Sequence, residues 1–235
     1  MKYKHFTNVP NQEFRDSWVE EQIEIHRARV QMTPCELLDV GAGLSPYKQM
    51  ITSKNINYYS QDFSGYQPNR NLDGFQESSW DYPVHDYICD ILEIDIGRKF
   101  DIVLCTEVLE HVPDPIRAFE VLVALLKPGG TLIITVPIMS LADQAPFWFH
   151  SGLTPYWFEH WAVRSELDRF NISLHGDFVD LEIQNMKTFF EFRKPWRIPG
   201  LARLHGVYFR KLSFFVKEEV RSSGGFGTLF VGIKK

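Results

Sequence analysis

Hydrophobic residues gather in short, nearly unbroken runs along the middle of the chain, with helix-forming segments between them. Five runs have this character: CELLDV from Cys35, INYYSQDF from Ile56, HDYICD from His85, FDIVLCT from Phe100 and TLIITVP from Thr131. Runs of this length without polar alternation are typical of strands in a parallel sheet that helices cover on both faces. The pattern therefore predicts an α/β fold for residues 34–137.

Helix signals frame these strands. Residues 11–31 are predicted to form an N-terminal helix with Asn11 as a cap and with Phe14, Trp18 and Ile25 on one apolar stripe. The segment SPYKQMI, after the glycines that follow the first strand, is predicted to open a second helix.

A third helix is predicted before the fifth strand. Asp114 is placed to cap it and Pro115 stands at its first position, while Gly129 and Gly130 follow its end. Residues 64–82 are polar and contain Gly, Pro and Asn, which predicts a loop.

The chain changes character after Pro137. An aromatic segment is followed by FVDLEIQN (residues 178–185) and GTLFVGIKK (residues 227–235), both of which we interpret as strands. Together these elements predict a Rossmann-like, mostly parallel seven-stranded sheet with helices on both faces. An N-terminal helix and an aromatic and basic C-terminal elaboration complete the prediction.

The turn that follows the first strand indicates a ligand site. Gly41 and Gly43 let the backbone turn sharply and approach a ligand closely. A dinucleotide fingerprint would place a glycine where Pro46 stands, and no Gly-Lys-Ser/Thr phosphate loop follows. Asp39 would lie close to a pyrophosphate and better suits a ligand that carries positive charge.

These residues resemble a known motif. DVGAGLS, from Asp39 to Ser45, resembles the first motif of class I S-adenosylmethionine-dependent methyltransferases, [DE]-x-G-x-G-x-G, with Ser45 in place of the third glycine. Asp62, CDIL, FDIVLCTEVLEHVPDP and LKPGGTLIITVP are similar to later blocks of the family, in the same order. The resemblance covers about residues 34–137 well and the remainder loosely.

The resemblance implies S-adenosylmethionine as the cofactor and a set of binding residues. Asp62 would accept hydrogen bonds from the ribose hydroxyls, Asp90 would approach the adenine amino group, and Ile91 would pack on the ring. The full implied set is Asp39, Gly41, Ala42, Gly43, Asp62, Phe63, Asp90, Ile91 and Thr106. Asp62 and Asp90 could instead be cap or turn residues, and Asp39 could orient the backbone or contact the cofactor.

Three residues are candidates for catalysis. A hydroxyl acceptor needs a base, and His111 in EHVPDP follows the fourth strand, at the expected edge of the cofactor. His150 is the second candidate base, and Glu107 could contact the methionine end of the cofactor. The alternatives are a packed or capping His111, a surface His150 and a helix-capping Glu107. We find no Asp and Asn cluster for a metal, so metal dependence is not expected.

The acceptor is predicted from the aromatic segment after the fifth strand. Aromatic faces can stack on sugars or flat substrates, although packing of the lid explains many such rings. The set is Phe147, Trp148, Phe149, Tyr156, Trp157, Phe158 and Trp161. FHSGLTPYWFEHW resembles the type 11 group of small methyltransferases, which implies a hydroxyl of a sugar, nucleotide sugar or glycan precursor. O- or N-methylation of an aromatic metabolite and a catalytically degenerate binding protein are the rival hypotheses.

Composition and charge limit the partners and the cellular compartment that we expect. The formal charge of the 235 residues is −5, which argues against nucleic acid as a partner. Neither a secretory signal nor a membrane-spanning run is visible, and Cys35, Cys89 and Cys105 suggest buried thiols, so a cytoplasmic protein is expected. The basic stretch 187–217 could hold a phosphate or lie against an anionic membrane. The expected organisation is one domain over residues 1–235, with an N-terminal helical segment (1–33), a cofactor-binding core (34–137) and an acceptor-binding lid with closing strands (138–235).

Overall fold

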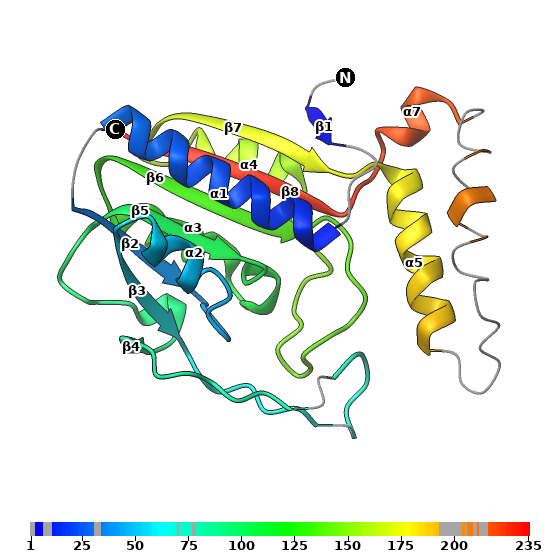
Figure 1. Cartoon of the computed structure of the whole chain (residues 1–235), viewed down its shortest axis with the longest axis horizontal. Helices are drawn as coiled ribbons and strands as arrows, with labels where there is room; N and C mark the ends of the chain where they lie inside the picture. Colours follow the sequence, from blue (N-terminus) through cyan, green and yellow to red (C-terminus); the bar gives the residue numbers. More distant parts are fainter. Residues whose placement is uncertain are drawn as a thin grey trace.

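A single sheet runs through the molecule, and helices pack on both of its faces (Figure 1). The computed structural model describes residues 3–6, 11–30, 34–69, 71–76, 79–192, 204, 206–208, 211 and 216–235. The strands in this part of the chain are β1 (Lys4–Phe6), β2 (Cys35–Val40), β3 (Ile56–Asp62), β4 (Tyr87–Ile88), β5 (Phe100–Thr106), β6 (Leu126–Pro137), β7 (Leu167–His175) and β8 (Gly227–Lys234). Their order across the sheet is β1-β7-β8-β6-β5-β2-β3-β4, and β8 alone among them runs against its neighbours.

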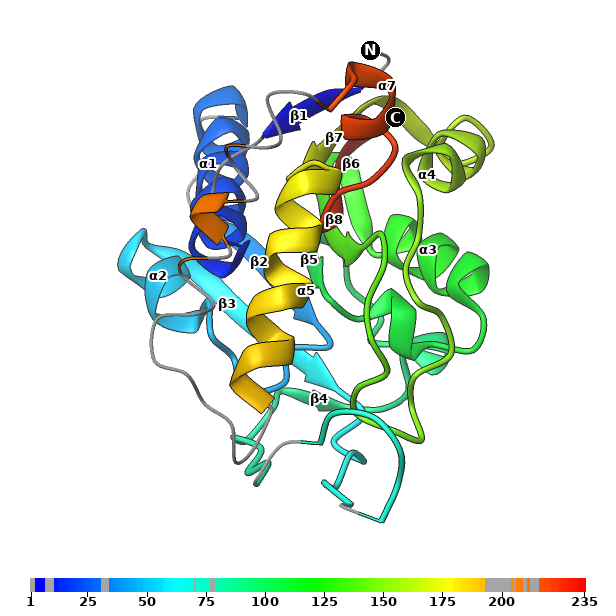
Figure 2. The same cartoon turned by 90° about the vertical axis from the view of Figure 1, so that its right-hand side faces the viewer.

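The helices form two layers around this sheet. In Figure 2, α1 and α2 lie on one side of the sheet and α3 and α4 lie on the other, while α5 stands near the carboxyl ends of the parallel strands. The bounds are α1 (Asn11–Val30), α2 (Lys48–Ser53), α3 (Pro115–Ala124), α4 (Pro155–Ala162), α5 (Phe178–Phe192) and α7 (Glu218–Arg221), with short 3₁₀ turns η1 (Ile91–Glu93) and η2 (Leu109–His111).

Each face of the sheet has its own hydrophobic core. Alternate side chains of a strand point to opposite faces, so β5 sends Val103 and Cys105 into one core and Ile102 and Leu104 into the other. All four side chains are fully buried. This burial on both faces explains why the central strands contain so few polar residues.

The predicted fold class is confirmed: the sheet is mostly parallel, and the predicted strands correspond to β2 through β6 and to β8. The third of them is shorter than predicted, since β4 covers only Tyr87 and Ile88. The structure also pairs β1 with β7, which brings the described sheet to eight strands instead of seven.

The prediction of a strand at FVDLEIQN is wrong. This segment begins α5, and the strand comes earlier, at β7. Asp177 and Asp180 explain the helix, because each carboxylate accepts a hydrogen bond from the other residue's backbone N–H, at 3.0 and 3.3 Å. Such a reciprocal pair satisfies two N–H groups that a helix start leaves without partners.

Three smaller predictions are also corrected. Ile25 is 52% exposed, whereas Trp18, Val19 and Ile23 form the buried stripe of α1. The helix capped by Asp114 ends at Ala124, because β6 begins at Leu126, before the glycines that were expected to end it. The three cysteines are free thiols, and Cys89 is only partly buried.

Candidate functional site

The site lies where the chain order of the strands reverses. Successive strands β3 and β4 continue outward on one side of β2, whereas β5 and β6 continue on the other. Ligands of open α/β sheets bind at the carboxyl ends of the strands at such a point. The turn after β2 and the turn after β5 therefore form the two walls of a crevice.

The first wall is the glycine turn. Gly41 has a φ of +67°, and a Cβ built on it would lie 2.4 Å from the Cγ2 of Val108, on the opposite wall. Only glycine fits both the left-handed backbone and this close approach. Ser45 takes the same left-handed conformation, with a φ of +55°, which explains why the third position of the resembled motif is usually glycine.

Asp62 holds this turn in place from the end of β3. Its two carboxylate oxygens accept hydrogen bonds from the backbone N–H of Gly43 at 2.9 Å and of Ser64 at 2.7 Å. The side chain is buried but lines the crevice, so its remaining lone pairs face the space where a ligand binds.

Asp39 lies beneath the turn and is almost completely buried, at 1% exposure. The hydroxyl of Tyr58 donates a hydrogen bond to it at 2.8 Å. Burial raises the pKa of Asp39 to about 7, the Tyr58 hydrogen bond acts in the opposite direction, and the neighbouring Asp62 charge raises the pKa further. The carboxyl is thus poised between its neutral and ionised forms near neutral pH.

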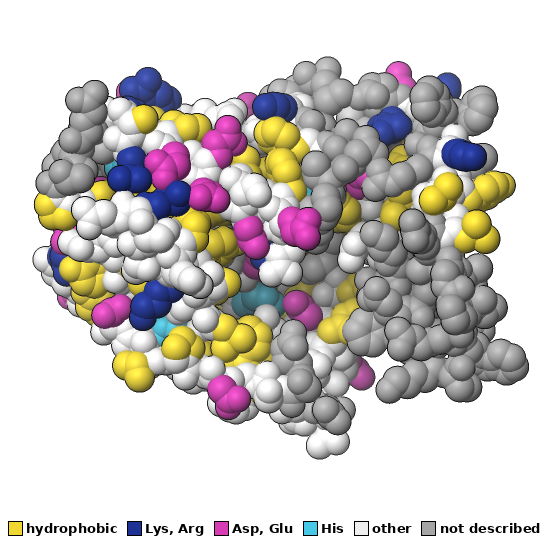
Figure 3. Space-filling view, viewed as in Figure 1, with side chains coloured by type: hydrophobic (Ala, Val, Ile, Leu, Met, Phe, Trp, Pro, Cys, Tyr) yellow, Lys and Arg dark blue, Asp and Glu magenta, His cyan; other side chains and the backbone are white. Residues whose placement is uncertain are grey.

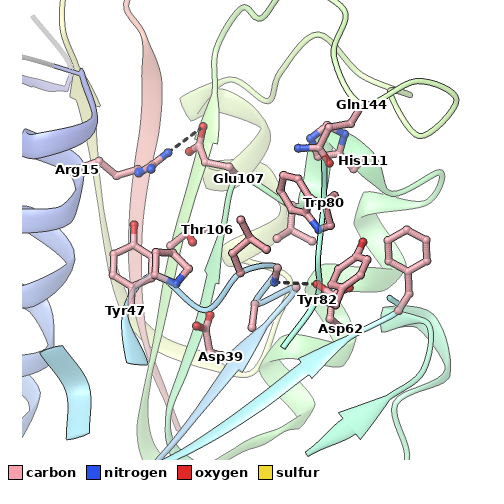
Figure 4. A pocket seen from close by; sticks show the side chains of 17 residues that line it. Arg15, Asp39, Tyr47, Asp62, Trp80, Tyr82, Thr106, Glu107, His111 and Gln144 are labelled. Carbon is pink, nitrogen blue, oxygen red and sulfur yellow. Dashed lines mark hydrogen bonds and ion pairs between the residues drawn. The ribbon is translucent and has the colours of Figure 1, made fainter. Parts of the chain in front are cut away.

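These walls enclose a first cavity of about 320 Å³ (Figure 4). Its lining brings together nine of the predicted site residues: Asp39, Gly41, Ala42, Gly43, Asp62, Phe63, Thr106, Glu107 and His111. Arg15 reaches in from α1, and its Nη1 lies 3.6 Å from the Oε2 of Glu107. No other Lys or Arg among the described residues lines this cavity.

A second, larger cavity of about 860 Å³ adjoins the first. The two share five lining residues: Arg15, Trp80, Glu107, His111 and Gln144. The aromatic and aliphatic part of the second lining includes Phe75, Phe226, Met139, Leu141 and Leu181. The two cavities are therefore neighbours, with these five side chains at their common boundary.

His111 lies on the shared wall with a defined orientation. Its Nδ1 is 2.8 Å from the carbonyl oxygen of Phe147, and a carbonyl can only accept, so Nδ1 carries the hydrogen. In the neutral imidazole, Nε2 then keeps a free lone pair. This nitrogen lies 3.8 Å from the Oε1 of Glu110.

Glu110 is a fully enclosed carboxyl on the wall of the second cavity. Burial, followed by repulsion from Glu107, holds its pKa well above the usual range. Its Oε2 has no hydrogen-bond partner in the described part of the chain. The charge of Arg15 acts in the opposite direction on this carboxyl, but burial and Glu107 have the larger effect.

Three predicted residues lie outside these cavities. Asp90 is exposed and caps η1, where its carboxylate accepts a hydrogen bond from the N–H of Leu92 at 2.8 Å. Ile91 belongs to the hydrophobic core, and His150 lines neither cavity. Asp90 thus caps η1, and its predicted contact with the adenine amino group stays a prediction.

The aromatic residues predicted to hold the acceptor also lie elsewhere. Phe158 is completely buried, Trp157 and Trp161 pack against the core, and Tyr156 is 62% exposed. None of the seven lines either cavity. Their packing role, which the sequence left as an alternative, accounts for them better.

Sequence reasoning missed several lining residues, above all Arg15, Tyr47, Trp80, Tyr82 and Gln144. Arg15 and Tyr47 lie outside the strand ends where site residues were sought. The other three lie in loops, whose sequences carry no periodic signal. The connection after β3 contains five aromatic residues, and these were the available hint: Phe63, Tyr66, Phe75, Trp80 and Tyr82.

In the described part of the chain, no three His, Cys, Asp or Glu side chains are grouped so that they could hold a metal ion. None of the helices described is both long and apolar enough to traverse a lipid bilayer. The basic stretch 187–217 lies mostly outside the described residues, so its predicted role stays a prediction.

A family model described as "Methyltransferase domain" matches residues 16–174, well over half of the chain. The chain belongs to this family. Membership confirms the predicted methyltransferase class, in which S-adenosylmethionine is the methyl donor. The narrower likeness to the type 11 group stays a prediction.

Curated relatives match part of this chain in sequence. A ubiquinone biosynthesis O-methyltransferase of Coxiella burnetii is 31% identical over 142 residues, which are 57% of this chain and 53% of the relative. A protein of the same name from Pseudomonas entomophila is 28% identical over 122 residues, 52% of this chain and 49% of the relative. The chain thus spans about half the length of the curated relatives that it matches.

Solved structures share the fold of the methyltransferase domain. A SAM-dependent methyltransferase from Archaeoglobus fulgidus is 13% identical with a TM-score of 0.53, covering 95% of this chain and 97% of the other. A plantazolicin methyltransferase, solved with a substrate analog and SAH, is 15% identical with a TM-score of 0.53, covering 95% and 86%. At these identities the likeness concerns the fold alone.

Proposed function

We propose that the chain transfers a methyl group from S-adenosylmethionine, bound in the first cavity, to a hydroxyl of a small acceptor in the second. The observation that carries this proposal is the wall of five residues that the two cavities share. Neighbouring cavities bring a donor and an acceptor close together, and positioning of the reactants supplies much of the rate acceleration in an in-line displacement.

The lining of the first cavity fits this donor. Asp62 offers carboxylate lone pairs for the ribose hydroxyls, and Arg15 offers a cation for the methionine carboxylate. The close approach at Gly41 leaves room that a Cβ would fill. The volume of about 320 Å³ lies within the usual range of small-molecule sites. The cofactor, when bound, supplies an electrophilic methyl group on a cationic sulfur.

His111 is the residue that we assign as the base. Its Nδ1–H is held by the Phe147 carbonyl, so Nε2 is free to take the proton of a hydroxyl in the second cavity. Glu107 is assigned a positioning role, since it is held by the Oγ1 of Thr135 at 2.8 Å and by Arg15. His150 has no assigned part in this scheme, because it lines neither cavity.

The charged residues that line the second cavity favour an uncharged acceptor. Glu107, Glu110 and Asp143 line it, and Arg15 is the only described Lys or Arg that does so. Asp and Glu side chains are also more prominent than Lys and Arg around the middle of the face shown in Figure 3. Phosphate groups of a nucleotide sugar would meet this acidic lining without enough cationic partners.

Two findings therefore favour a hydroxyl on an aromatic ring over the sugar or glycan hydroxyl expected from the sequence. Phe75, Trp80 and Phe226 line the cavity with aromatic surface. The curated relatives are named as O-methyltransferases of ubiquinone biosynthesis, and no glycan enzyme is among those compared above. A cytoplasmic setting and the absence of nucleic-acid partners remain predictions.

The experiment is a methyl-transfer screen with isotopically labelled S-adenosylmethionine. The acceptors are a panel of simple phenols and a panel of sugars and nucleotide sugars, and each is tested with wild type and with His111→Ala. We expect labelled product from phenols, with turnover lowered by at least 100-fold in the variant, a typical loss for a missing general base. Product from nucleotide sugars alone would overturn the acceptor class. Full turnover by His111→Ala would overturn the assignment of the base.

A further inference from the structure

The connection between β3 and β4 folds back over the site and is anchored there. Within it, the N–H of Phe75 donates to the carbonyl oxygen of Ala142 at 2.7 Å, and the N–H of Gln144 donates back to the Phe75 carbonyl at 3.0 Å. The hydroxyl of Tyr66 donates to Gln76 at 3.1 Å. The first two bonds tie the connection to the loop after β6, and the third lies within the connection itself.

This anchoring brings Trp80 onto the glycine turn. A Cβ built on Gly43 would lie 3.3 Å from the Cζ2 of the indole, so the ring packs where a side chain would otherwise stand. Tyr66 and Tyr82 support the ring, with centroids 5.4 and 6.0 Å from it in edge-on arrangements. Figure 4 shows Trp80 between His111 and Tyr82.

Trp80 is also one of the five residues on the shared wall. A methyl group that passes from the first cavity to the second must cross this wall. The cationic sulfur that carries the methyl group therefore comes close to whatever ring stands there. Trp80 is the only one of the five shared lining residues with a benzenoid ring, and an indole presents the most electron-rich face among the natural side chains.

We propose that the indole of Trp80 binds the sulfonium centre of S-adenosylmethionine by a cation–π contact and makes the site prefer the charged donor over its neutral product. The inference rests on the proposed function, since it assumes that this donor occupies the first cavity. Trp80, in the connection after β3, is then a second determinant of donor binding, separate from the glycine turn and from Asp62. The contact is lost when the methyl group leaves, because S-adenosylhomocysteine has an uncharged thioether, and product release is thereby favoured.

The test compares binding of S-adenosylmethionine with binding of S-adenosylhomocysteine by calorimetry in wild type, Trp80→Phe and Trp80→Leu. The measured quantity is the ratio of the two affinities, which cancels contacts that both ligands share. We expect Trp80→Leu to lower this preference for the charged donor by about 3- to 30-fold, and Trp80→Phe to lower it by a smaller factor. Trp80→Met replaces Trp80→Leu if thermal melting shows that the leucine variant does not fold.

Trp148→Leu is the matched control, because this tryptophan lies in the neighbouring loop, donates to the Oγ of Ser140 at 3.2 Å and lines neither cavity. Its affinity ratio should equal that of wild type. The inference is overturned if Trp80→Leu keeps the wild-type ratio, or if the control lowers the ratio equally. It is also overturned if phenylalanine and leucine have equal effects. Failure of wild type to bind either ligand would instead refute the proposed function.

Discussion

Replacing Asp39 with asparagine tests how the buried carboxyl beneath the glycine turn titrates. Asparagine keeps the shape and the oxygen that accepts the Tyr58 hydroxyl, but it cannot ionise. The comparison of the variant with wild type at several pH values therefore isolates the ionisation of Asp39. Titrations of groups that do not interact with Asp39 cancel in the difference.

The magnitude follows from the pKa. Burial raises the pKa of Asp39 from 3.8 to about 7, so the folded protein holds this proton more tightly than the unfolded chain does. The free energy of unfolding of wild type therefore falls as pH rises from about 4 to about 7 and is unaffected by Asp39 above that. At about 1.4 kcal/mol for each tenfold change in proton affinity, the loss amounts to roughly 4 kcal/mol.

The assay is urea unfolding of wild type and Asp39→Asn between pH 4 and pH 8. We expect the stability of the variant relative to wild type to increase by about 3 to 4 kcal/mol across this range. Asp168→Asn is the control, since that side chain is 60% exposed and its replacement should leave the pH dependence unchanged. A flat difference for Asp39→Asn would show that Asp39 ionises as freely as it does in the unfolded chain.

Further variants test other parts of the site. His111→Gln should abolish most turnover and leave the affinity for S-adenosylmethionine unchanged. His150→Gln should keep wild-type turnover and affinity. Equal losses of turnover in the two variants would contradict the different roles assigned to the two histidines. Arg15→Met should weaken the binding of S-adenosylmethionine by roughly 10-fold or more, because a charge-assisted hydrogen bond is lost, and an unchanged dissociation constant would exclude its contact with the methionine carboxylate. The free energy of unfolding in urea should be about 1 kcal/mol higher for Ser45→Gly than for Ser45→Ala, because both variants lack the hydroxyl and only alanine places a Cβ in a left-handed conformation. The opposite order of stability would contradict the left-handed conformation at this position.

The central strands and the glycine turn could be predicted because their signals are local. Buried parallel strands leave continuous apolar runs, and the positive φ values at Gly41 and Gly43 leave glycines. The strand-end position of Asp62 follows from the same kind of run, INYYSQDF, which ends beside it. Features that depend only on residues within a few positions of a strand end could therefore be predicted from the sequence.

Other features depend on contacts between distant segments. Val179, Leu181 and Ile183 alternate as they would in a strand, and all three are buried, but the Asp177 and Asp180 pair starts a helix. In β7, Phe170, Ile172 and Leu174 alternate in the same way, and there the segment is a strand. A short hydrophobic segment fits either element, and the capping pair was the signal that distinguishes them.

The acceptor side shows the same limit. Aromatic residues such as Phe158 were expected to face a substrate, yet this ring is buried between α4 and the sheet, with its centroid 5.1 Å from that of Phe230. Trp80 and Arg15 reach the site from segments far from the motif in sequence. Composition alone does not distinguish a ring that packs in the core from a ring that lines a cavity, because both are apolar and burial is favourable for both.

The most direct test of the account is a calorimetric titration of wild type and Asp62→Asn with S-adenosylmethionine and, separately, with NAD. We expect wild type to bind S-adenosylmethionine and not NAD. We expect Asp62→Asn to bind S-adenosylmethionine roughly 10- to 100-fold more weakly, because hydrogen bonds from the ribose hydroxyls to a carboxylate are lost. Binding of NAD at the glycine turn, or no binding of S-adenosylmethionine by the folded wild-type protein, would contradict the account.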